Sequence, residues 1–524
     1  MRRRLPWISA LVATLYITIV LWSDRTGADA VRAMDLYGSL AAAALSVALG
    51  WAVSARLTDD RDRRGIVALI FGMWGPLSAT AQLMLALNVH PIFESPLFSA
   101  LVWTLFCASL AFLASRGRSD LSFATRTIAF AAGFLAVTQT VRVVQLRRAI
   151  GTRNVFAAAR PTGVPDVYLI VLDKYSSGQW MSYTYGVDQS AFEDSLRALG
   201  FVVPRAARAN YAHTHLSLAS FLNWRYLDAE TDGVGGPPWG RTRELVSEAR
   251  TWAAFREKGY RILTFPTPLF GRIDEVWDAD VAMRWPGDRR TGFAETWWNN
   301  SPLAPLIGSD CRAPWCRGSA ATPYPVESLA EIDWKLRTLT QLPDSAGPVF
   351  AYLHLLVPHE PYLFDDSCAP VEPWWPQTDQ DESFDAVGRA YAAQVRCFTP
   401  RVLNTVRTII ARSKVPPVIL IQSDHGHARI FTNLLRGFTL TREQMTEDQV
   451  GERHGVFAAY RFPGADSVVT DDISAVNVFP LVAQALWKSP HERVADRSYF
   501  SSYQETFRFT EVPAHLTVPP RPAR

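Results

Sequence analysis

The stretch Pro417-Val-Ile-Leu-Ile-Gln-Ser-Asp-His-Gly426 joins a short apolar run to an acid, an imidazole and a glycine. A short apolar run bounded by turn residues is typical of a buried strand. Open α/β sheets bind ligands beyond the carboxyl ends of their strands, and Asp with His suits a zinc- or manganese-like ion. The stretch therefore predicts a strand that brings Asp424 and His425 to a metal site. A strand that ends in a plain polar turn has the same pattern.

Three further apolar runs in the second half of the chain carry acids or histidines near their ends. Asp173 follows the run at 167–172. His354 lies near the end of the run at 349–356, and His359 follows that run. His454 precedes the run at 455–461. Another apolar run at 260–265 carries none. These runs alternate with helical patterns at 190–199, 215–226, 243–258, 326–341, 383–412 and 471–487. Such alternation predicts an α/β sandwich with a mostly parallel sheet that is covered on both faces.

Thr214 is the candidate nucleophile because it precedes an apolar helical pattern, where we expect it to be the N-cap. Backbone N–H groups and the helix dipole favour phosphate or sulfate at such a position. A metal ion bound to the hydroxyl would lower its pKa and make it nucleophilic. A cap without a catalytic role is the alternative. His213 and His215 flank Thr214 and are candidates for substrate binding, with a surface role as the alternative.

Residues 1–148 contain five apolar stretches, at 5–22, 36–55, 65–89, 95–115 and 123–145. Each is close to the ~20 residues that cross a bilayer as a helix, so we expect an anchor of five transmembrane helices. Arginines in alternate loops predict, by the positive-inside rule, that everything after the anchor lies outside the cytoplasm. This organisation is that of a multi-pass protein of the bacterial cytoplasmic membrane. It has a linker at 149–164, a periplasmic catalytic domain at 165–512 and a disordered tail at 513–524.

Charge and cysteine content agree with that location. The net charge of +3 gives no indication of nucleic-acid binding. Four of the five cysteines fall after residue 148, and disulfides persist in exported domains. Their spacing favours the pairs Cys311–Cys316 and Cys368–Cys397, with zinc binding as the alternative.

Taken together, these motifs resemble those of the alkaline phosphatase superfamily. Asp173, Thr214-x-x-Ser217, His354-x4-His359, Ser-Asp-His-Gly at 423–426 and His454-Gly455 stand in the order found there. The architecture looks like that of its membrane-anchored, sulfatase-like branch, which includes phosphoethanolamine transferases and lipoteichoic acid synthases. Two departures matter: phosphoethanolamine transferases usually have Glu at the position of Asp173, and no cysteine here lies in the C/S-x-P-x-R sequence that arylsulfatases need.

The resemblance implies specific roles for these residues. Asp173, Thr214, Asp424 and His425 would hold a divalent ion, zinc or manganese rather than calcium or magnesium. Thr214 would carry the covalent phospho-intermediate. His359 and His454 would hold a second ion or the transferred group, and His354 would contact the phosphate or act as an acid. Lys174 and Arg453 are candidates for binding an anionic substrate, with a structural ion pair as the alternative.

The expected function is a metal-dependent transfer of a phospho group from a membrane phospholipid to a lipid or glycan of the cell envelope. A hydrolase of phosphate or sulfate esters that uses the same site is the second hypothesis. A non-catalytic envelope protein that retains the fold is the third. The full set of candidate ligands argues against the third.

Overall fold

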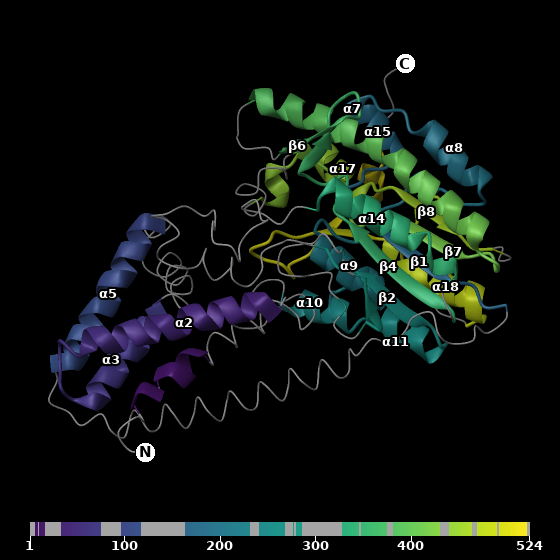
Figure 1. Ribbon diagram of the computed structural model, residues 1–524. Coiled ribbons are helices and arrows are strands. Elements are labelled where there is room, and N and C mark those ends of the chain that lie inside the picture. The colour runs from purple at the N-terminus through teal and green to yellow at the C-terminus, as the bar shows by residue number, and fades with distance from the viewer. Residues whose placement is uncertain are drawn as a thin grey trace. The chain divides into compact units, whose positions relative to one another are not determined.

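The computed structural model divides into two compact units, residues 1–152 with 289–323 and residues 153–288 with 324–524 (Figure 1). The structure describes residues 6–8, 10–15, 33–74, 96–116, 163–230, 240–267, 276, 279–283, 285, 327–344, 347–374, 381–429, 440–463, 469–489 and 492–520.

The first unit contains the helices α2 (Ala33–Ser54), α3 (Arg61–Trp74) and α5 (Pro96–Arg116). The indole of Trp74 donates a hydrogen bond to Thr104 at 3.1 Å, and that of Trp103 donates to the carbonyl of Trp74 at 2.9 Å, which ties α3 to α5. Within the described residues, no helix combines the length and the apolar character that a membrane span requires. The expected anchor of five transmembrane helices is corrected on this finding. The helix α3, for example, has only 14 residues and begins with Arg61-Asp-Arg-Arg64. The predicted span at 123–145 lies outside the described residues.

The second unit is built on a six-stranded sheet. Its strand order is β3 (Val281–Ala282), β2 (Arg261–Phe265), β4 (Val349–Leu355), β1 (Val167–Leu172), β7 (Val418–Ser423) and β8 (Ala458–Arg461). Every neighbouring pair is parallel except β7 with β8, so the predicted mostly parallel sheet is confirmed. Leu172 is in register with Leu355 and with Ser423. The central strands β4, β1 and β7 therefore end side by side.

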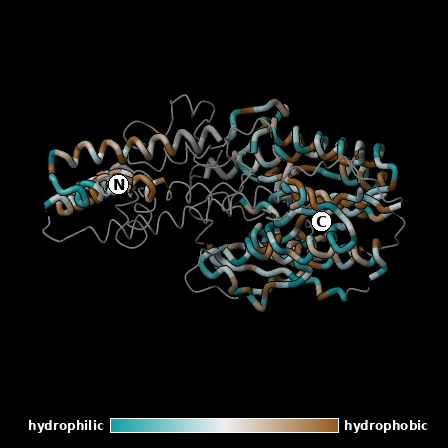
Figure 2. The backbone as a smooth tube through the Cα atoms, turned by 60° about the horizontal axis from the view of Figure 1, so that its bottom comes forward, coloured by the Kyte–Doolittle hydropathy of each residue, from teal (hydrophilic) through white to brown (hydrophobic). Residues whose placement is uncertain are grey.

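Helices cover both faces of this sheet, and its central strands β1, β4 and β7 are buried at every position. Tyr168, Ile170 and Leu172 pack on one face, beneath α7 (Gly178–Tyr185), α8 (Ser190–Ala198), α14 (Leu329–Leu339) and α15 (Asp381–Arg412). Val167 and Leu169 pack on the other face, against α9 (Thr214–Asn223), α10 (Gly240–Ser247), α11 (Arg250–Glu257) and α18 (Val478–Trp487). Figure 2 shows hydrophobic and hydrophilic residues interspersed along the helical tubes of the chain.

Smaller elements complete the second unit. The helix α17 (Glu447–His454) leads toward β8, and two antiparallel pairs join β5 (Tyr362–Phe364) to β6 (Pro370–Trp374) and β9 (Ser498–Phe500) to β10 (Thr510–Val512). The short 3-10 helices are η5 (Leu342–Asp344), η7 (Arg442–Gln444), η8 (Ala475–Asn477) and η9 (Ala514–Thr517). The last of these falls in the expected disordered tail, which is corrected for residues 513–520. Leu516 and Thr517 are buried, and the indole of Trp180 donates to the Thr517 carbonyl at 2.9 Å.

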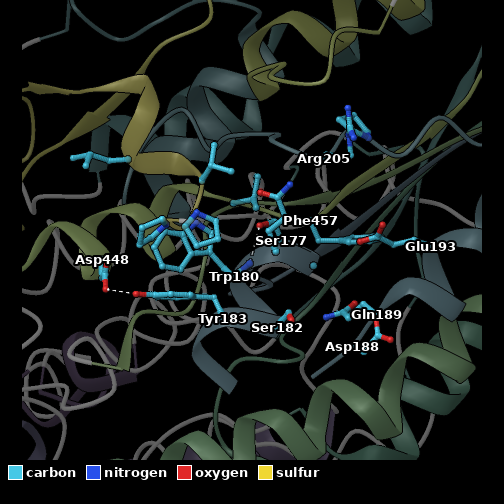
Figure 3. A pocket seen from close by; sticks show the side chains of 18 of the residues that line it. Ser177, Trp180, Ser182, Tyr183, Asp188, Gln189, Glu193, Arg205, Asp448 and Phe457 are labelled. Atoms are coloured by element: carbon cyan, nitrogen blue, oxygen red, sulfur yellow. Dashed lines mark hydrogen bonds between the residues drawn. The ribbon is translucent and has the colours of Figure 1, made fainter. Parts of the chain in front are cut away.

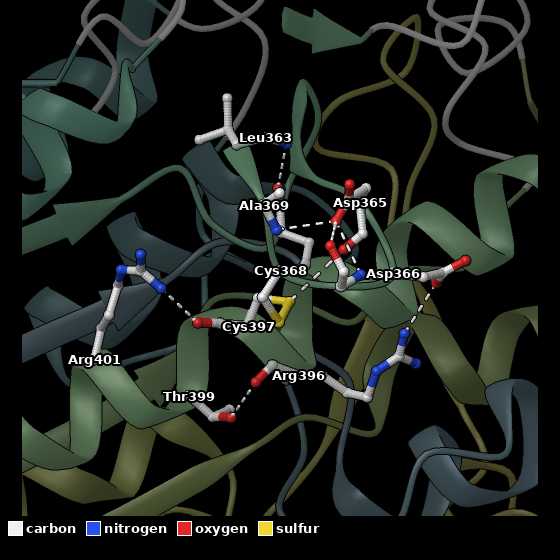
Figure 4. The surroundings of a disulfide bond; sticks show 11 residues. Leu363, Asp365, Asp366, Cys368, Ala369, Arg396, Cys397, Thr399 and Arg401 are labelled. Carbon is white, nitrogen blue, oxygen red and sulfur yellow. Dashed lines mark hydrogen bonds and ion pairs between the residues drawn. A yellow bond between two sulfur atoms is a disulfide. The ribbon is translucent and has the colours of Figure 1, made fainter. Parts of the chain in front are cut away.

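A disulfide joins Cys368, in the turn between β5 and β6, to Cys397 on α15 (Figure 4). This confirms the predicted pairing. The carboxylate of Asp365 accepts hydrogen bonds from the backbone of Ser367 and Ala369, which shapes the turn that presents Cys368. The predicted pair Cys311–Cys316 lies outside the described residues.

Candidate metal centre and active site

Two buried carboxylates occupy the ends of neighbouring strands. Asp173 follows β1 and is fully buried, and Asp424 follows β7 with 4 % of its surface exposed. Both carboxylate oxygens of Asp173 and Oδ2 of Asp424 accept no hydrogen bond from any described residue. Burial, followed by repulsion from Asp424, raises the pKa of Asp173 well above its usual value. Buried carboxylates without donors are costly, and a bound cation would remove that cost.

His425 presents a lone pair to these carboxylates. Its Nδ1 lies 3.1 Å from the carbonyl of Gly426, so we assign the proton to Nδ1 and leave Nε2 as an acceptor. Nε2 lies 3.3 Å from Oδ2 of Asp424 and 3.9 Å from Oδ1 of Asp173. Burial and then the positive charges of Arg453 and Lys174 hold the pKa of His425 well below its usual value. A neutral imidazole whose Nε2 carries no proton is the form that binds metal.

His354, on β4, completes the group. Its Nε2 lies 3.7 Å from Oδ2 of Asp173, and its side chain is fully buried. One ligand atom from each of Asp173, His354 and Asp424 lies within 4.8 Å of the others. This buried Asp/His/Asp group could hold a metal ion, and its unpaired oxygens fit one. A ligand role for His354 fits this position, and the expected contact with phosphate or action as an acid stays a prediction.

Thr214 lies at the edge of the same group. Thr214 is the first residue of α9 and not the predicted N-cap. The N-cap is His213. The hydroxyl of Thr214 lies 3.1 Å from Nε2 of His425. Nη2 of Arg453 lies 3.1 Å from the same nitrogen. Two donors thus converge on one lone pair. The structure therefore brings together the four residues predicted to share an ion, and adds His354 to them.

The two predicted substrate-binding cations are held by other groups. Arg453 donates from Nε to the carbonyl of Ala212 at 2.7 Å and from Nη1 to the carbonyls of Gly426 and His427, both at 3.1 Å. It therefore braces the turn that follows β7 while one nitrogen faces His425. Lys174 forms a buried ion pair with Glu360 at 2.7 Å, which is the alternative weighed from the sequence. Its backbone N–H donates to Oδ1 of Asp424 at 3.2 Å.

His359 and His454 lie outside the Asp173/His354/Asp424 group. His454 ends α17, and its ring nitrogens lie 2.8 Å from the carbonyl of Val450 and 3.2 Å from that of Tyr499. Both nitrogens therefore face backbone oxygens. The ring of His359 lies against Glu360, although its backbone N–H donates to the carbonyl of Asp173 at 3.1 Å. The expected second ion site on these two histidines is therefore not assembled among the described residues.

Comparison with known proteins places this geometry in context. No family model matches the sequence, and a search of curated proteins found no match. A phosphonate monoester hydrolase of Agrobacterium radiobacter is 14% identical over 64% of this chain and 80% of its own, with a TM-score of 0.39. The zinc complex of the periplasmic domain of EcEptC from Escherichia coli is 9% identical over 68% of this chain and 96% of its own, with a TM-score of 0.42. A putative sulfatase of Bacteroides fragilis, yidJ, is 13% identical over 66% of this chain and 83% of its own, with a TM-score of 0.39.

Other solved structures similar to this chain include periplasmic or soluble domains of phosphoethanolamine transferases and a protein of the alkaline phosphatase superfamily from Vibrio parahaemolyticus. The resemblance to the sulfatase-like branch of that superfamily stays a prediction from the sequence motifs. Identities this low and TM-scores below 0.5 carry no argument about the reaction or the substrate.

Three residues that contribute to the site were missed in the sequence. The hydroxyl of Ser423 accepts from the Tyr175 backbone at 2.9 Å and donates to the carbonyl of His425 at 2.7 Å, which links the turns after β1 and β7. The carboxyl of Glu452 accepts a hydrogen bond from Tyr185. Tyr503 packs its ring against His213. Ser423 could have been found, because it stands within the quoted motif. Glu452 and Tyr503 carry no local signal.

A cavity of about 1130 Å³ lies apart from these residues (Figure 3). It is lined by α7, α8 and the C-terminal segment, and its wall includes Trp180, Tyr183 and Glu193. The hydroxyl of Tyr183 donates to Asp448 at 3.2 Å on this wall. Asp173, Thr214, Asp424 and His425 are not among its lining residues. The metal-binding group and this cavity are therefore separate features of the unit.

Proposed function

We propose that the protein is a metal-dependent enzyme that transfers a substituted phospho group through a covalent phospho-threonine at Thr214. One observation carries the proposal. The Thr214 hydroxyl lies at a helix N-terminus and 3.1 Å from Nε2 of His425. Beside it are two buried carboxylates, of which both oxygens of Asp173 and Oδ2 of Asp424 accept no hydrogen bond from a described residue. A nucleophile, an anion-binding helix end and a cation site thus meet at one place.

Asp173, His354, Asp424 and His425 would hold one divalent ion, with the hydroxyl of Thr214 at its edge. Carboxylate oxygens mixed with imidazole nitrogens suit zinc or manganese, whereas calcium and magnesium prefer oxygen ligands alone. When bound, the ion would lower the pKa of the hydroxyl and neutralise charge that develops on the phospho group.

The residues of the chain account for the two steps of transfer. In the first step the Thr214 oxygen forms a bond to phosphorus, the bond from phosphorus to the donor alcohol breaks, and the hydroxyl proton leaves with that alcohol. In the second step the oxygen of an acceptor hydroxyl forms a bond to phosphorus, the bond from phosphorus to the Thr214 oxygen breaks, and the proton of the acceptor hydroxyl passes to Thr214. Backbone N–H groups at the start of α9 and the buried charge of Arg453 stabilise the phospho oxygens.

A membrane phospholipid is our proposed donor, and a lipid or glycan of the cell envelope is our proposed acceptor. The disulfide between Cys368 and Cys397 supports an extracytoplasmic location, because disulfides persist in oxidising compartments. With water as the acceptor the same site would be a hydrolase of phosphate or sulfate esters.

The test is the mass of Thr214 after exposure to donor. Purified protein loaded with zinc is incubated with a head-group-labelled phospholipid, and its peptides are weighed. We expect a mass gain on Thr214 in the wild type and in Thr214→Ser, and none in Thr214→Ala. Turnover of a generic phosphodiester should fall at least about 1000-fold in Thr214→Ala, as for loss of a covalent nucleophile.

Ser217→Ala is the matched control, because this hydroxyl lies one turn along α9 and donates to the carbonyl of Tyr211 at 2.8 Å. It should be labelled like the wild type. Full turnover by Thr214→Ala would refute the nucleophile. If water removes the phospho group from labelled Thr214 and no acceptor hydroxyl does, the hydrolase hypothesis replaces the transferase hypothesis.

A further inference from the structure

Tyr503 lies beside the turn that presents Thr214, although nearly 300 residues separate them in the sequence. Its ring centroid is 4.0 Å from that of His213 and 5.5 Å from that of His215, the two residues that flank Thr214. The carbonyl of Ser501 lies 2.8 Å from Nε2 of His213 and holds this late segment in place. The aromatic ring of Tyr503 is thus fixed next to the nucleophile.

The ring of Tyr503 stacks on residues that lie close to the charged groups of the site. Arg453 and the carboxylates of Asp173 and Asp424 are near enough to shift the pKa of its phenol. Arg453 in turn lies 3.1 Å from His425 through Nη2. Tyr503 is only partly buried, whereas Arg453 and Asp173 are buried. Tyr503 is therefore the more exposed member of this group of residues.

Tyr503 stays protonated at neutral pH. Burial raises the pKa of its phenol, Arg453 opposes that effect, and the neighbouring carboxylates add to it, which brings the pKa to about 12. His215 beside it is neutral as well, because burial lowers its pKa to about 3. The phenol is therefore an uncharged O–H donor on a residue that packs against both neighbours of Thr214. Phospho groups in transfer need donors of this kind at their non-bridging oxygens.

We propose that Tyr503 is a further catalytic residue, whose hydroxyl donates a hydrogen bond to a non-bridging oxygen of the phospho group that Thr214 receives. This inference rests on the proposed function. It assigns the C-terminal segment of the unit to substrate recognition, a role that no motif in the sequence indicates.

The competing explanation is that Tyr503 only supports the rings of His213 and His215. Tyr503→Phe separates the two, because phenylalanine keeps the ring and removes the hydroxyl. We expect the single-turnover rate of Thr214 labelling to fall about 10- to 100-fold in this variant, the effect of losing one hydrogen bond to a charged group. Affinity for inorganic phosphate, measured by calorimetry on the zinc-loaded protein, should fall by a similar factor. Zinc content should not change.

Tyr183→Phe is the matched control, because the Tyr183 hydroxyl pairs with Asp448 at the separate cavity. It should match the wild type in both measurements. If Tyr503→Phe binds phosphate and labels Thr214 as well as the wild type does, the inference is overturned. Failure of the proposed function has a different signature, which is an unlabelled Thr214 in the wild type itself. Phosphate binding still reports on Tyr503 in that case.

Discussion

Glu452 is a buried acid that no step of the proposed reaction uses. Its carboxyl accepts a hydrogen bond from Tyr185, whose hydroxyl also lies 2.7 Å from Nδ1 of His427. The ring of His427 stacks on Tyr391 with 3.8 Å between centroids. Burial raises the pKa of Glu452 to about 7, against the hydrogen bond from Tyr185. This network packs beneath the turn after β7.

The raised pKa predicts a pH-dependent stability. The unfolded carboxyl titrates near ~4.3, so between that pH and about 7 the folded protein keeps a proton that the unfolded chain has lost. The free energy of unfolding should therefore fall as pH rises through this window, by at most about 1.4 kcal/mol per pH unit. Urea denaturation at pH 5, 6 and 7 should show a flatter dependence for Glu452→Gln than for the wild type. The exposed Glu447→Gln is the control, and parallel curves for wild type and Glu452→Gln would contradict the prediction.

Single residues also show how far the sequence reaches. Asp173, Asp424 and His425 could be placed together because each follows an apolar run, and parallel strands end at one edge. Lys174 and His454 could not be placed, since their partners Glu360 and Tyr499 come from distant segments. Long-range pairing of this kind leaves no trace in local spacing.

At the scale of elements, the turn after β7 has no room for a side chain at Gly426. A Cβ there would lie 1.8 Å from the carbonyl oxygen of Glu452 on α17. Gly426→Ala should therefore push the turn away from α17, at a cost of about 3 kcal/mol or more. It should also lower bound zinc, because Asp424 and His425 belong to the same turn. Urea denaturation and elemental analysis measure the two effects.

Gly178→Ala provides the contrast. A Cβ there would meet Oε1 of Glu193 at 2.2 Å, which is the far end of a flexible side chain. The Gly178→Ala variant should lose little free energy of unfolding and should bind as much zinc as the wild type. Equal stability of the two variants would show that the turn can move without loss.

The central strands were predictable, but the helices α7 and α17 were not. The runs at 167–172 and 349–356 match β1 and β4 almost residue for residue, because buried strands are mostly apolar. The helix α17 was missed, although Thr446 and Gln449 form a capping box at its start. That polar signal precedes a helix of eight residues with a weak apolar pattern. His454 was therefore placed just before a strand, whereas it ends α17.

For the whole molecule, metal binding should contribute directly to stability. A ligand that binds only the folded state stabilises it by about 2.7 kcal/mol at 100 times its Kd. Chelation should thus lower the melting temperature, and added zinc should restore it. Asp424→Asn should melt at the same temperature with and without zinc. A wild type whose melting does not respond to chelation would contradict the assignment of Asp173, His354 and Asp424 as a metal site.

The late segment that contains Tyr503 and contacts His213 affects when the site is completed during synthesis of the chain. Domains form as the chain emerges from the ribosome, N-terminal parts first. Asp173, Thr214 and Asp424 are all made before β9 (Ser498–Phe500), whose following residues close the turn around Thr214. A nascent chain that stops before this segment has every metal ligand but an unsupported nucleophile. In the proposed enzyme, the nucleophile would therefore gain this support only after the segment that follows β9 has been synthesised.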